Sequence, residues 1–504
     1  MIYLVTKVKA LFKSSKYECI SIERSKEIIN SMKKIRGLDT ETMGLNPHTK
    51  ALLTVQIGTK ENQVVIDCTT INIWEYKDIL EDSTILYILA NAKFDTQFFF
   101  KHNIILSKVW DVMLAEKIRY LGYPKGSFHA DLKTLEYKYL NKYMDKTVRG
   151  KITKVGLTEE VIVYAANDVV DLEDLMNAQI KALEKEDLVK AVQLENRFVI
   201  PLAYMEWCGV KLDVEKWKAK MVKDAKRLKI ALTKLNDWVV KHYGNDSRFT
   251  KVDLQGDLFS GFNTDPQCTI NWNSAAQVIP LFKAIGINTS TIDSKTKKLK
   301  DSVDAKLLEP QSKDFEILPI YLDYKEAQKV CSTYGQNWLD QINPETGRVY
   351  TKFNQLGTNT ARISSGGKDK NAKIEYVNFL NLPADPETRS CFIAEKGNSW
   401  ISIDYSGQES FIMASISNDK ALIHELMEGS GDLHSLTAYM SYPDQIPRDT
   451  KITEIKEKYH HLRQLAKKIE FGFNYGGDFN TIHRNLGISI EEAKKIYENY
   501  MSGF

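Results

Sequence analysis

Short apolar runs alternate with segments of helical periodicity over about the first 110 residues, and this alternation is the strongest constraint on what the chain can fold into. The runs IRGLDTET, LLTVQIGT and NQVVIDC have the length and β-branched content of strands. Near them in the chain, KEIINSMKKI and KFDTQFFFKHN repeat their apolar residues at a helical period. Strands that alternate with helices are typical of α/β folds. We therefore predict an α/β domain at the N-terminus.

The remainder of the chain is mostly helical in pattern, with strands returning late. Residues 110–200 are helical in period, and the lysine-rich stretch 216–242 predicts a long helix. Residues 244–312 are polar and rich in Asn, Thr, Ser and Asp, which indicates an irregular insertion in a helical arm. Further on, RVYTKFNQ and SWISIDYS have the pattern of strands, and two helical segments follow, Ile455–Tyr475 and Ile490–Met501. With 504 residues, the chain has room for three or four domains.

The composition is that of a folded globular protein. Charged residues make up 27% and hydrophobic residues 43% of the chain, which excludes a disordered or collagen-like protein. The net charge of +3 means that a nucleic acid would be met by local basic patches, not by a field over the whole protein. The six cysteines never approach CxxC spacing, so neither a zinc site nor a disulfide scaffold is indicated. No apolar run is long enough for a signal peptide or a membrane span, and we predict a cytosolic protein.

Three short segments of the N-terminal third carry acids at spacings that suit a shared site. Asp39 and Glu41 lie two apart in a strand pattern and therefore project from one face, although Asp-x-Glu recurs elsewhere in the chain. Asp95 stands at a helix start, where the helix dipole alone would also favour an acid. Tyr164 and Asp168 lie four apart on one helical face, a pair that a buried tyrosine beside an exposed acid would explain equally well.

The segments LDTET, NAKFD and YAAND, in this order, resemble the DEDDy-type 3′-5′ exonuclease family. Hydrolysis of a phosphodiester by this type of site uses two divalent cations, and Mg²⁺ or Mn²⁺ takes oxygen ligands. The resemblance implies that Tyr164 orients the attacking water and that an acid in VWDVMLAEKIR, Asp111, is structural. It also implies that the metals are held by four acids, Asp39, Glu41, Asp95 and Asp168.

The C-terminal third contains a second group of candidate residues. Asp404 follows the apolar run SWISI, where it would end a strand or simply cap the next helix. Arg463, Lys467, Phe471 and Tyr475 recur every four residues and form a slowly winding stripe of two cations and then two aromatics. Such a stripe is either a solvated row of cations followed by core aromatics, or a surface that grips a triphosphate and stacks near a base.

With TNTARISSGG and PLAYMEWCGVKLD, these segments resemble family A DNA polymerases. The resemblance implies an α/β protein with a ribonuclease H-like 3′-5′ exonuclease domain, followed by the helical thumb, partial palm and partial fingers of a polymerase right hand. We expect the exonuclease domain over residues 1–190 and a helical connector and thumb with an insertion over 191–347. The N-terminal part of the palm would then occupy 348–425, and part of the fingers 426–504. The basic stretches 216–242 and TKKLK would grip duplex phosphates in the thumb, or serve only for solubility.

The resemblance also implies roles for single residues of the polymerase half. Asp404 would be a palm metal ligand, and Glu409 would crowd the sugar 2′ position against ribonucleotides. His434 in GDLHSLTA would contact the incoming phosphates, or else be a surface helix residue. Arg463 and Lys467 would bind the triphosphate. Phe471 and Tyr475 would contact the sugar and templating base, and Arg362 would contact the primer end in the minor groove.

The sequence departs from the family in the palm, because it contains no His-Asp-Glu turn that would supply a second carboxylate. One carboxylate alone would hold the second cation poorly, and missing palm strands would expose a sheet edge and an apolar face. We therefore expect a fragment of a longer protein, the product of an interrupted gene, or one half of a split polymerase completed by a C-terminal polypeptide.

The function we predict is DNA replication by a proofreading polymerase in the cytosol of a bacterium or a phage-infected cell. Its partners would be DNA primer-template, single-stranded 3′ ends and deoxynucleoside triphosphates (dNTPs), with no membrane. RNA remains open as a substrate of the nuclease site, because two-metal hydrolysis needs nothing from the sugar. The alternatives are a stand-alone 3′-5′ exonuclease with a vestigial polymerase region and a non-catalytic DNA-binding subunit.

Overall fold

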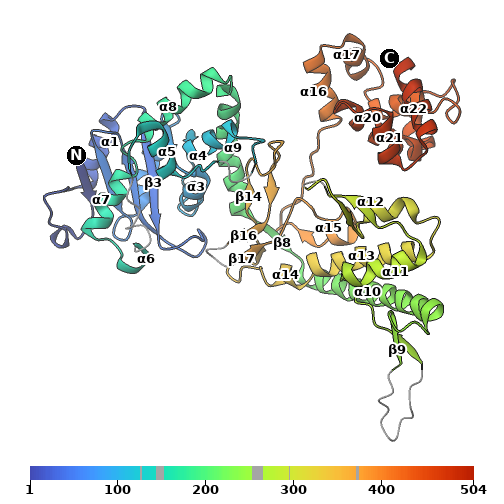
Figure 1. Cartoon of the computed structure of the whole chain (residues 1–504). Coiled ribbons are helices and arrows are strands. Elements are labelled where there is room, and N and C mark those ends of the chain that lie inside the picture. The colour runs from blue at the N-terminus through green and yellow to red at the C-terminus, as the bar shows by residue number, and fades with distance from the viewer. Residues whose placement is uncertain (125–127, 144–151, 253–264, 294–295, 370–373, 504) are drawn as a thin grey trace, which may run out of the picture. The chain divides into compact units, whose positions relative to one another are not determined.

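The computed structural model describes residues 1–124, 128–143, 152–252, 265–293, 296–369 and 374–503 (Figure 1). The chain divides into two compact units, each built from two separate stretches of sequence. The first unit contains Met1–Lys229 and Glu326–Asn398, and the second contains Ile230–Lys325 and Ser399–Phe504. Each unit is described by itself below.

A seven-stranded mixed sheet forms the centre of the N-terminal part of the first unit, with the strand order β2-β1-β5-β4-β3-β6-β7. Strand β4 runs antiparallel to both of its neighbours, whereas the other adjacent pairs are parallel. The three strands predicted from apolar runs are confirmed as β3, β4 and β5. The strand bounds are Ile2–Val5, Glu18–Ile20, Ile35–Thr42, Leu52–Gly58, Gln63–Asp67, Leu86–Leu89 and Val109–Asp111 for β1 to β7.

Helices cover both faces of this sheet, which explains why β4 and β5 are buried along their whole length. On one face, α1 (Ile22–Ser31) and α3 (Ala92–Phe100) pack with the strands into a core that includes Leu38 of β3. On the other face, α7 (Glu159–Asn167) and α8 (Leu172–Lys185) contact the central strands. The rest of this part consists of η1 (Lys9–Leu11), η2 (Ile73–Tyr76), α2 (Lys77–Leu80), α4 (Val112–Arg119), α5 (Leu132–Leu140) and α6 (Ile152–Val155).

The remainder of the first unit surrounds a small three-stranded sheet of order β13-β8-β18. Its core contains the indoles of Trp217 and Trp338, which are tilted by 37° to each other with ring centroids 5.3 Å apart. The predicted lysine-rich helix is confirmed as α10 (Val214–Tyr243), which continues into the second unit. The other elements are α9 (Val189–Cys208), β8 (Val210–Leu212), α14 (Gln336–Leu339), β13 (Arg348–Val349), β14 (Phe353–Asn354), β15 (Ser364–Ser365), β16 (Gly367–Asp369), β17 (Ile374–Tyr376), α15 (Pro386–Arg389) and β18 (Phe392–Ile393).

The second unit is mainly helical. Its earlier stretch contains two short hairpins, β9–β10 and β11–β12, with bounds Thr250–Val252, Pro266–Cys268, Ser290–Ile292 and Leu299–Asp301. The helices there are α11 (Ala275–Ile285), α12 (Ala305–Leu308) and η3 (Glu309–Gln311). Helix α13 (Ile317–Thr333) belongs to this unit up to Lys325 and to the first unit from Glu326. Its later stretch contains α16 (Gln408–Ser417), α17 (Lys420–Met427), α18 (Leu433–Ser441), α19 (Ile452–Lys458), α20 (His460–Asn474), α21 (Phe479–Leu486) and α22 (Ile490–Gly503).

Three local predictions need correction. SWISIDYS, residues 399–406, forms no strand, because a strand requires a hydrogen-bonded neighbour and this segment pairs with none of the described residues. The predicted helix Ile455–Tyr475 breaks at Tyr459, whose φ of −125° and ψ of 40° are not helical. The long helical pattern after residue 158 is likewise three helices, α7, α8 and α9. Apolar periodicity survives these short breaks in the backbone, so the pattern alone does not reveal them.

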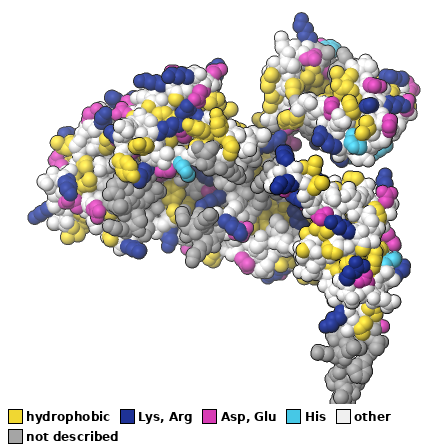
Figure 2. Space-filling model, viewed as in Figure 1, with side chains coloured by type: hydrophobic (Ala, Val, Ile, Leu, Met, Phe, Trp, Pro, Cys, Tyr) yellow, Lys and Arg dark blue, Asp and Glu magenta, His cyan; other side chains and the backbone are white. Residues whose placement is uncertain are grey.

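The surface carries both signs of charge. On the face drawn in Figure 2, basic and acidic side chains are interspersed over the described surface, in keeping with the net charge of +3. Among the described residues, no helix has the length and apolar character needed to cross a membrane.

Candidate functional sites

Three carboxylates meet on one face of the seven-stranded sheet, over the interior strand β3. Asp39 and Glu41 come from β3, and Asp168 follows the last turn of α7. One ligand oxygen from each lies within 4.8 Å of the others. Strand alternation explains the meeting, because Asp39 and Glu41 project from the face of β3 that α7 and α8 cover. Carboxylate oxygens are the ligands that Mg²⁺ and Mn²⁺ prefer, so this donor set fits the predicted metals.

Glycine at position 37 allows the segment with Asp168 to approach β3 this closely. A Cβ atom on Gly37 would lie 2.6 Å from the carbonyl oxygen of Val169 and 2.9 Å from its Cβ. A second strand glycine, Gly58, is crowded by the same valine, with 2.7 Å to its Cγ2. The residue after Asp168 therefore packs directly on two glycines, and this contact sets the distance between Asp168 and the acids of β3.

Asp95, the fourth predicted acid, is not part of this three-carboxylate cluster. It lies on α3, which covers the opposite face of the sheet, and is only 2% exposed. Its Oδ1 accepts a hydrogen bond of 2.6 Å from the hydroxyl of Thr40, which points to that face between Asp39 and Glu41. Burial raises the pKa of Asp95 to about 7, against the lowering effect of the Thr40 hydrogen bond. The fourth acid is thus linked to the same strand through Thr40.

Two other residues of this region have clear local roles. Tyr164 is buried on α7 one turn before Asp168, and its carbonyl accepts the backbone N–H of Asp168 at 3.2 Å. Asp111 accepts the backbone N–H groups of Ala92 and Met113, each at 2.9 Å. It thereby caps the start of α4 and holds the start of α3, although burial raises its pKa. Asp111 is structural, as predicted.

A cavity of about 470 Å³ in the second unit brings together four of the residues predicted for the polymerase site, one metal ligand and three that bind the nucleotide. These are Asp404, His434, Arg463 and Lys467. The Arg463 guanidinium donates two hydrogen bonds of 2.9 Å to the carboxylate of Asp432, which also lines the cavity. Burial would raise the pKa of Asp432, but hydrogen bonds from Arg463 and Ser435 outweigh it and hold the pKa below its usual value.

A buried carboxylate that sequence reasoning missed, Glu470, joins three helices around this cavity. It accepts a hydrogen bond of 2.7 Å from Ser410 of α16 and pairs with Nδ1 of His434 of α18. Glu470 is 3% exposed and lies on α20 two turns after Arg463. The sequence signal that could have identified it is an acid on a helix face that is otherwise apolar.

The remaining predicted residues of the polymerase half are not among those that line this cavity. Tyr475 is 73% exposed, and its hydroxyl lies 3.5 Å from Oε1 of Glu409, the limit of a hydrogen bond. Phe471 belongs to α20, but its side chain lies outside the described residues. Arg362 belongs to the first unit, where it is exposed in a turn closed by a 3.0 Å hydrogen bond from its N–H to Thr358.

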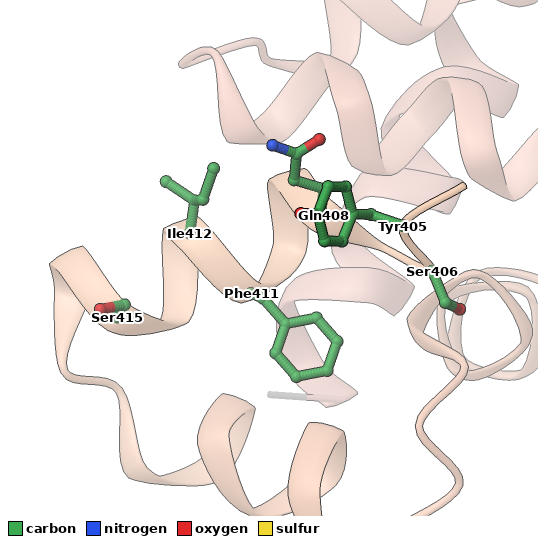
Figure 3. Close-up of a pocket in the computed structure, with 6 residues that line it drawn as sticks. All are labelled: Tyr405, Ser406, Gln408, Phe411, Ile412 and Ser415. Atoms are coloured by element: carbon green, nitrogen blue, oxygen red, sulfur yellow. The ribbon is translucent and has the colours of Figure 1, made fainter. Parts of the chain in front are cut away.

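An apolar hollow of about 430 Å³ lies beside the start of α16. Figure 3 shows Phe411 and Ile412 of α16 at this hollow, with Tyr405 just before the helix. Before it, Ile401, Ile403 and Tyr405 are 79%, 89% and 80% exposed. Exposed apolar residues at every second position are the pattern of a strand face that lacks a covering layer.

The two groups of residues lie in stretches of the chain that match different family models. Residues 19–183 match the family model described as 3′-5′ exonuclease, and residues 262–504 match the one described as DNA polymerase family A. The chain belongs to the family A DNA polymerases. Its N-terminal part is the exonuclease domain of such a protein, and the predicted α/β fold with this domain followed by a polymerase-like region is confirmed.

Relatives align with nearly the whole chain. The DNA polymerase I of Borreliella burgdorferi is 28% identical over 95% of this chain, and the DNA polymerase of Mycobacterium phage D29 is 24% identical over 94%. The chain spans 49% of the length of the first relative and 75% of the second. A solved structure, the POL domain of Pol1 from M. smegmatis in complex with DNA primer-template and dNTP, has a TM-score of 0.66 at 21% identity. The match covers 93% of this chain and 72% of that one, and it supports the fold.

Proposed function

We propose that this chain is the proofreading part, and part of the polymerase, of a DNA-directed DNA polymerase that acts in DNA replication. The observation that carries the proposal is the convergence of Asp39, Glu41 and Asp168 within 4.8 Å in a domain that matches 3′-5′ exonucleases. Relatives from a bacterium and a phage support a place in the cytoplasm of a bacterial or phage-infected cell. The domain boundaries at residues 190, 347 and 425 remain part of the proposal.

In the exonuclease domain, we propose that Asp39, Glu41 and Asp168 hold divalent cations, Mg²⁺ or Mn²⁺. Asp95, expected as a fourth metal ligand, lies on the opposite face of β3 and would support the site through its hydrogen bond to Thr40. When bound, such ions supply an activated water and stabilise the leaving oxygen of a phosphodiester. Tyr164 would orient the attacking water from α7. The substrate would be the 3′ end of a single DNA strand, since removal of a terminal nucleotide is the reaction that the domain's family performs.

In the polymerase half, the cavity lined by Asp404, His434, Arg463 and Lys467 would take a dNTP. Arg463 and Lys467 offer donors to phosphate oxygens, and Glu470 fixes the His434 ring beside them. Asp404 would be a metal ligand and Glu409 would exclude the 2′-hydroxyl. Contact with the sugar and templating base is proposed for Phe471 and Tyr475, and contact with the primer end for Arg362. A relative's structure holds primer-template and dNTP, which supports the same partners here.

We further propose that a C-terminal polypeptide completes the palm. The exposed residues Ile401, Ile403 and Tyr405 support this, because an added strand would cover their apolar side chains and pair the backbone of residues 399–406. Asp404 lies in the same segment and would be held by that pairing. Among the described residues, Asp404 belongs to no cluster of three potential metal ligands.

The test of the nuclease is degradation of a 3′-labelled single-stranded oligonucleotide with Mg²⁺. We expect the chain to remove nucleotides from the 3′ end, and Asp39→Ala and Glu41→Ala to lower the rate by several orders of magnitude. Glu215→Ala is the matched control, since Glu215 also belongs to an Asp-x-Glu pair but is exposed on α10 beside Lys218. No nuclease activity in the unchanged chain, or full activity in both cluster variants, would contradict the proposal.

The test of the polymerase half is primer extension by this chain mixed with a polypeptide that carries a His-Asp-Glu turn. Synthesis that appears on mixing and is lost in Asp404→Ala would support the proposed palm. If the mixture extends primers equally well with Asp404→Ala, the assignment of that residue is wrong, whatever the nuclease assay shows.

A further inference from the structure

The cavity of about 470 Å³ is also lined by a lysine that no sequence pattern singled out, Lys456 of α19. The predicted cations of the cavity, Arg463 and Lys467, both come from α20. A basic side chain from a second helix means that positive charge borders the cavity from two elements. This arrangement suits an elongated anion more than a compact one.

The position of Lys456 is fixed by its neighbour in the sequence. Ile455 is fully buried and belongs to a core cluster with Ala438, Leu462 and Ile496. Helix α19 is thereby anchored to α18 and α20, while Lys456 is exposed and lines the cavity. The break in the helix at Tyr459 makes α19 a separate element. An anchored backbone lowers the entropy that an otherwise mobile lysine loses when it binds a ligand.

The charges around the cavity are not equally compensated. Arg463 is paired with Asp432 through two hydrogen bonds of 2.9 Å. On α19 itself, Lys458 pairs with Glu454 at 2.8 Å. Lys456 forms no salt bridge with any residue that the structure describes. Its ammonium group can therefore attract an anion without first breaking an ion pair, unlike the guanidinium of Arg463.

We propose that Lys456 binds the phosphate chain of the incoming nucleotide and favours triphosphates over monophosphates. The inference rests on the nucleotide site proposed above and adds a residue to it. Because Lys456 and the α20 cations line one cavity from two helices, we expect the three phosphate groups of a triphosphate to engage both sets of cations and a single phosphate to engage fewer of them. Ammonium groups bind phosphate oxygens through charge-assisted hydrogen bonds.

The experiment is equilibrium binding of a fluorescent dATP analogue to the full chain with Mg²⁺, followed by competition with unlabelled dATP, inorganic triphosphate and dAMP. Lys456→Gln should weaken dATP and triphosphate binding about three- to tenfold, as expected for loss of a partly exposed charged contact, with little change for dAMP. Lys456→Arg should restore most of the affinity. The matched control is Lys458→Gln, which removes the same charge from the same helix at an exposed position paired with Glu454, and should bind as the unchanged chain does.

The outcomes separate this inference from the proposed function. If the unchanged chain binds dATP but Lys456→Gln binds it equally well, or if Lys458→Gln loses as much affinity, the role of Lys456 is wrong and the nucleotide site stands. If the unchanged chain binds neither dATP nor inorganic triphosphate, both the nucleotide site and this inference are overturned. A second measurement is acetylation of lysines followed by mass spectrometry, in which dATP should protect Lys456 and leave Lys458 reactive. Equal reactivity of Lys456 with and without dATP would also overturn the inference.

Discussion

Replacing Gly37 with alanine tests whether the carboxylate cluster depends on the tight contact between β3 and the residue after Asp168. The added Cβ would lie 2.6 Å from the carbonyl oxygen of Val169, whereas ordinary contacts of a Cβ lie at 3.4–4 Å. The two segments must separate by about 0.8 Å, the difference between 3.4 and 2.6 Å. Because the clash is with backbone and not with the end of a flexible side chain, no rotamer change can relieve it.

Two consequences follow from this separation. Overpacking of this kind typically costs about 1–3 kcal/mol of unfolding free energy, and we expect the upper part of that range. Asp168 precedes Val169 and moves with it, away from Asp39 and Glu41. A misplacement of about 1 Å can cost on the order of 100-fold in rate, so we expect exonuclease activity to fall about 10- to 100-fold.

The assay combines urea unfolding with single-turnover degradation of a single-stranded oligonucleotide over a range of Mg²⁺ concentrations. Gly122→Ala is the control, since an alanine there is strained by a φ of 88° but its Cβ meets no atom within 4 Å. The control should lose stability and keep its exonuclease rate per folded molecule. If Gly37→Ala unfolds at the same urea concentration as the unchanged chain and degrades DNA at the same rate, the packing argument is wrong.

Two further predictions concern stability in each unit. Trp217 is fully buried against Trp338, so Trp217→Ala should cost about 3–5 kcal/mol and Trp217→Phe clearly less, as urea unfolding followed by circular dichroism would show. The lowered pKa of Asp432, held by Arg463, means that its ionised form stabilises the fold above the usual carboxyl pKa of about 3.9 and that this contribution is lost as the pH falls through the lowered pKa. Asp432→Asn should therefore flatten the decline of stability below about pH 4, measured by thermal unfolding at each pH.

The exonuclease half was predictable from sequence where the pattern is local. The buried strands β3, β4 and β5 follow from continuous apolar runs, and the shared orientation of Asp39 and Glu41 follows from strand alternation. The meeting with Asp168 depends on strand order and on contacts between residues more than a hundred positions apart, which spacing cannot supply. It came from the resemblance to a family. Asp95 lies on the face of β3 to which Thr40 points, apart from the carboxylate cluster. This position depends on which helix covers which face of the sheet, and no pattern in the sequence shows it.

The second unit was harder to predict, because its site depends on tertiary contacts. Four candidate residues that recur at every fourth position predicted a stripe on one helix. Two of them, Arg463 and Lys467, do line one cavity. Two carboxylates position the cavity residues: Asp432, which caps the start of α18, and Glu470 of α20. They are recognised only when these helices are packed together. The break at Tyr459 was hidden because an apolar period continues across it.

The two halves differ in what holds their acids in place. Asp39 and Glu41 stand on a strand paired on both sides within a covered sheet, so the described residues alone fix their geometry. Asp404 stands between exposed Ile403 and Tyr405, in a segment that pairs with no strand of the part of the chain that the structure describes. A metal ligand must be held within a fraction of an ångström, and an unpaired segment cannot do this. If the proposed roles are right, exonuclease activity and nucleotide binding should be measurable with this chain by itself, whereas we expect nucleotide addition only once a paired strand holds Asp404.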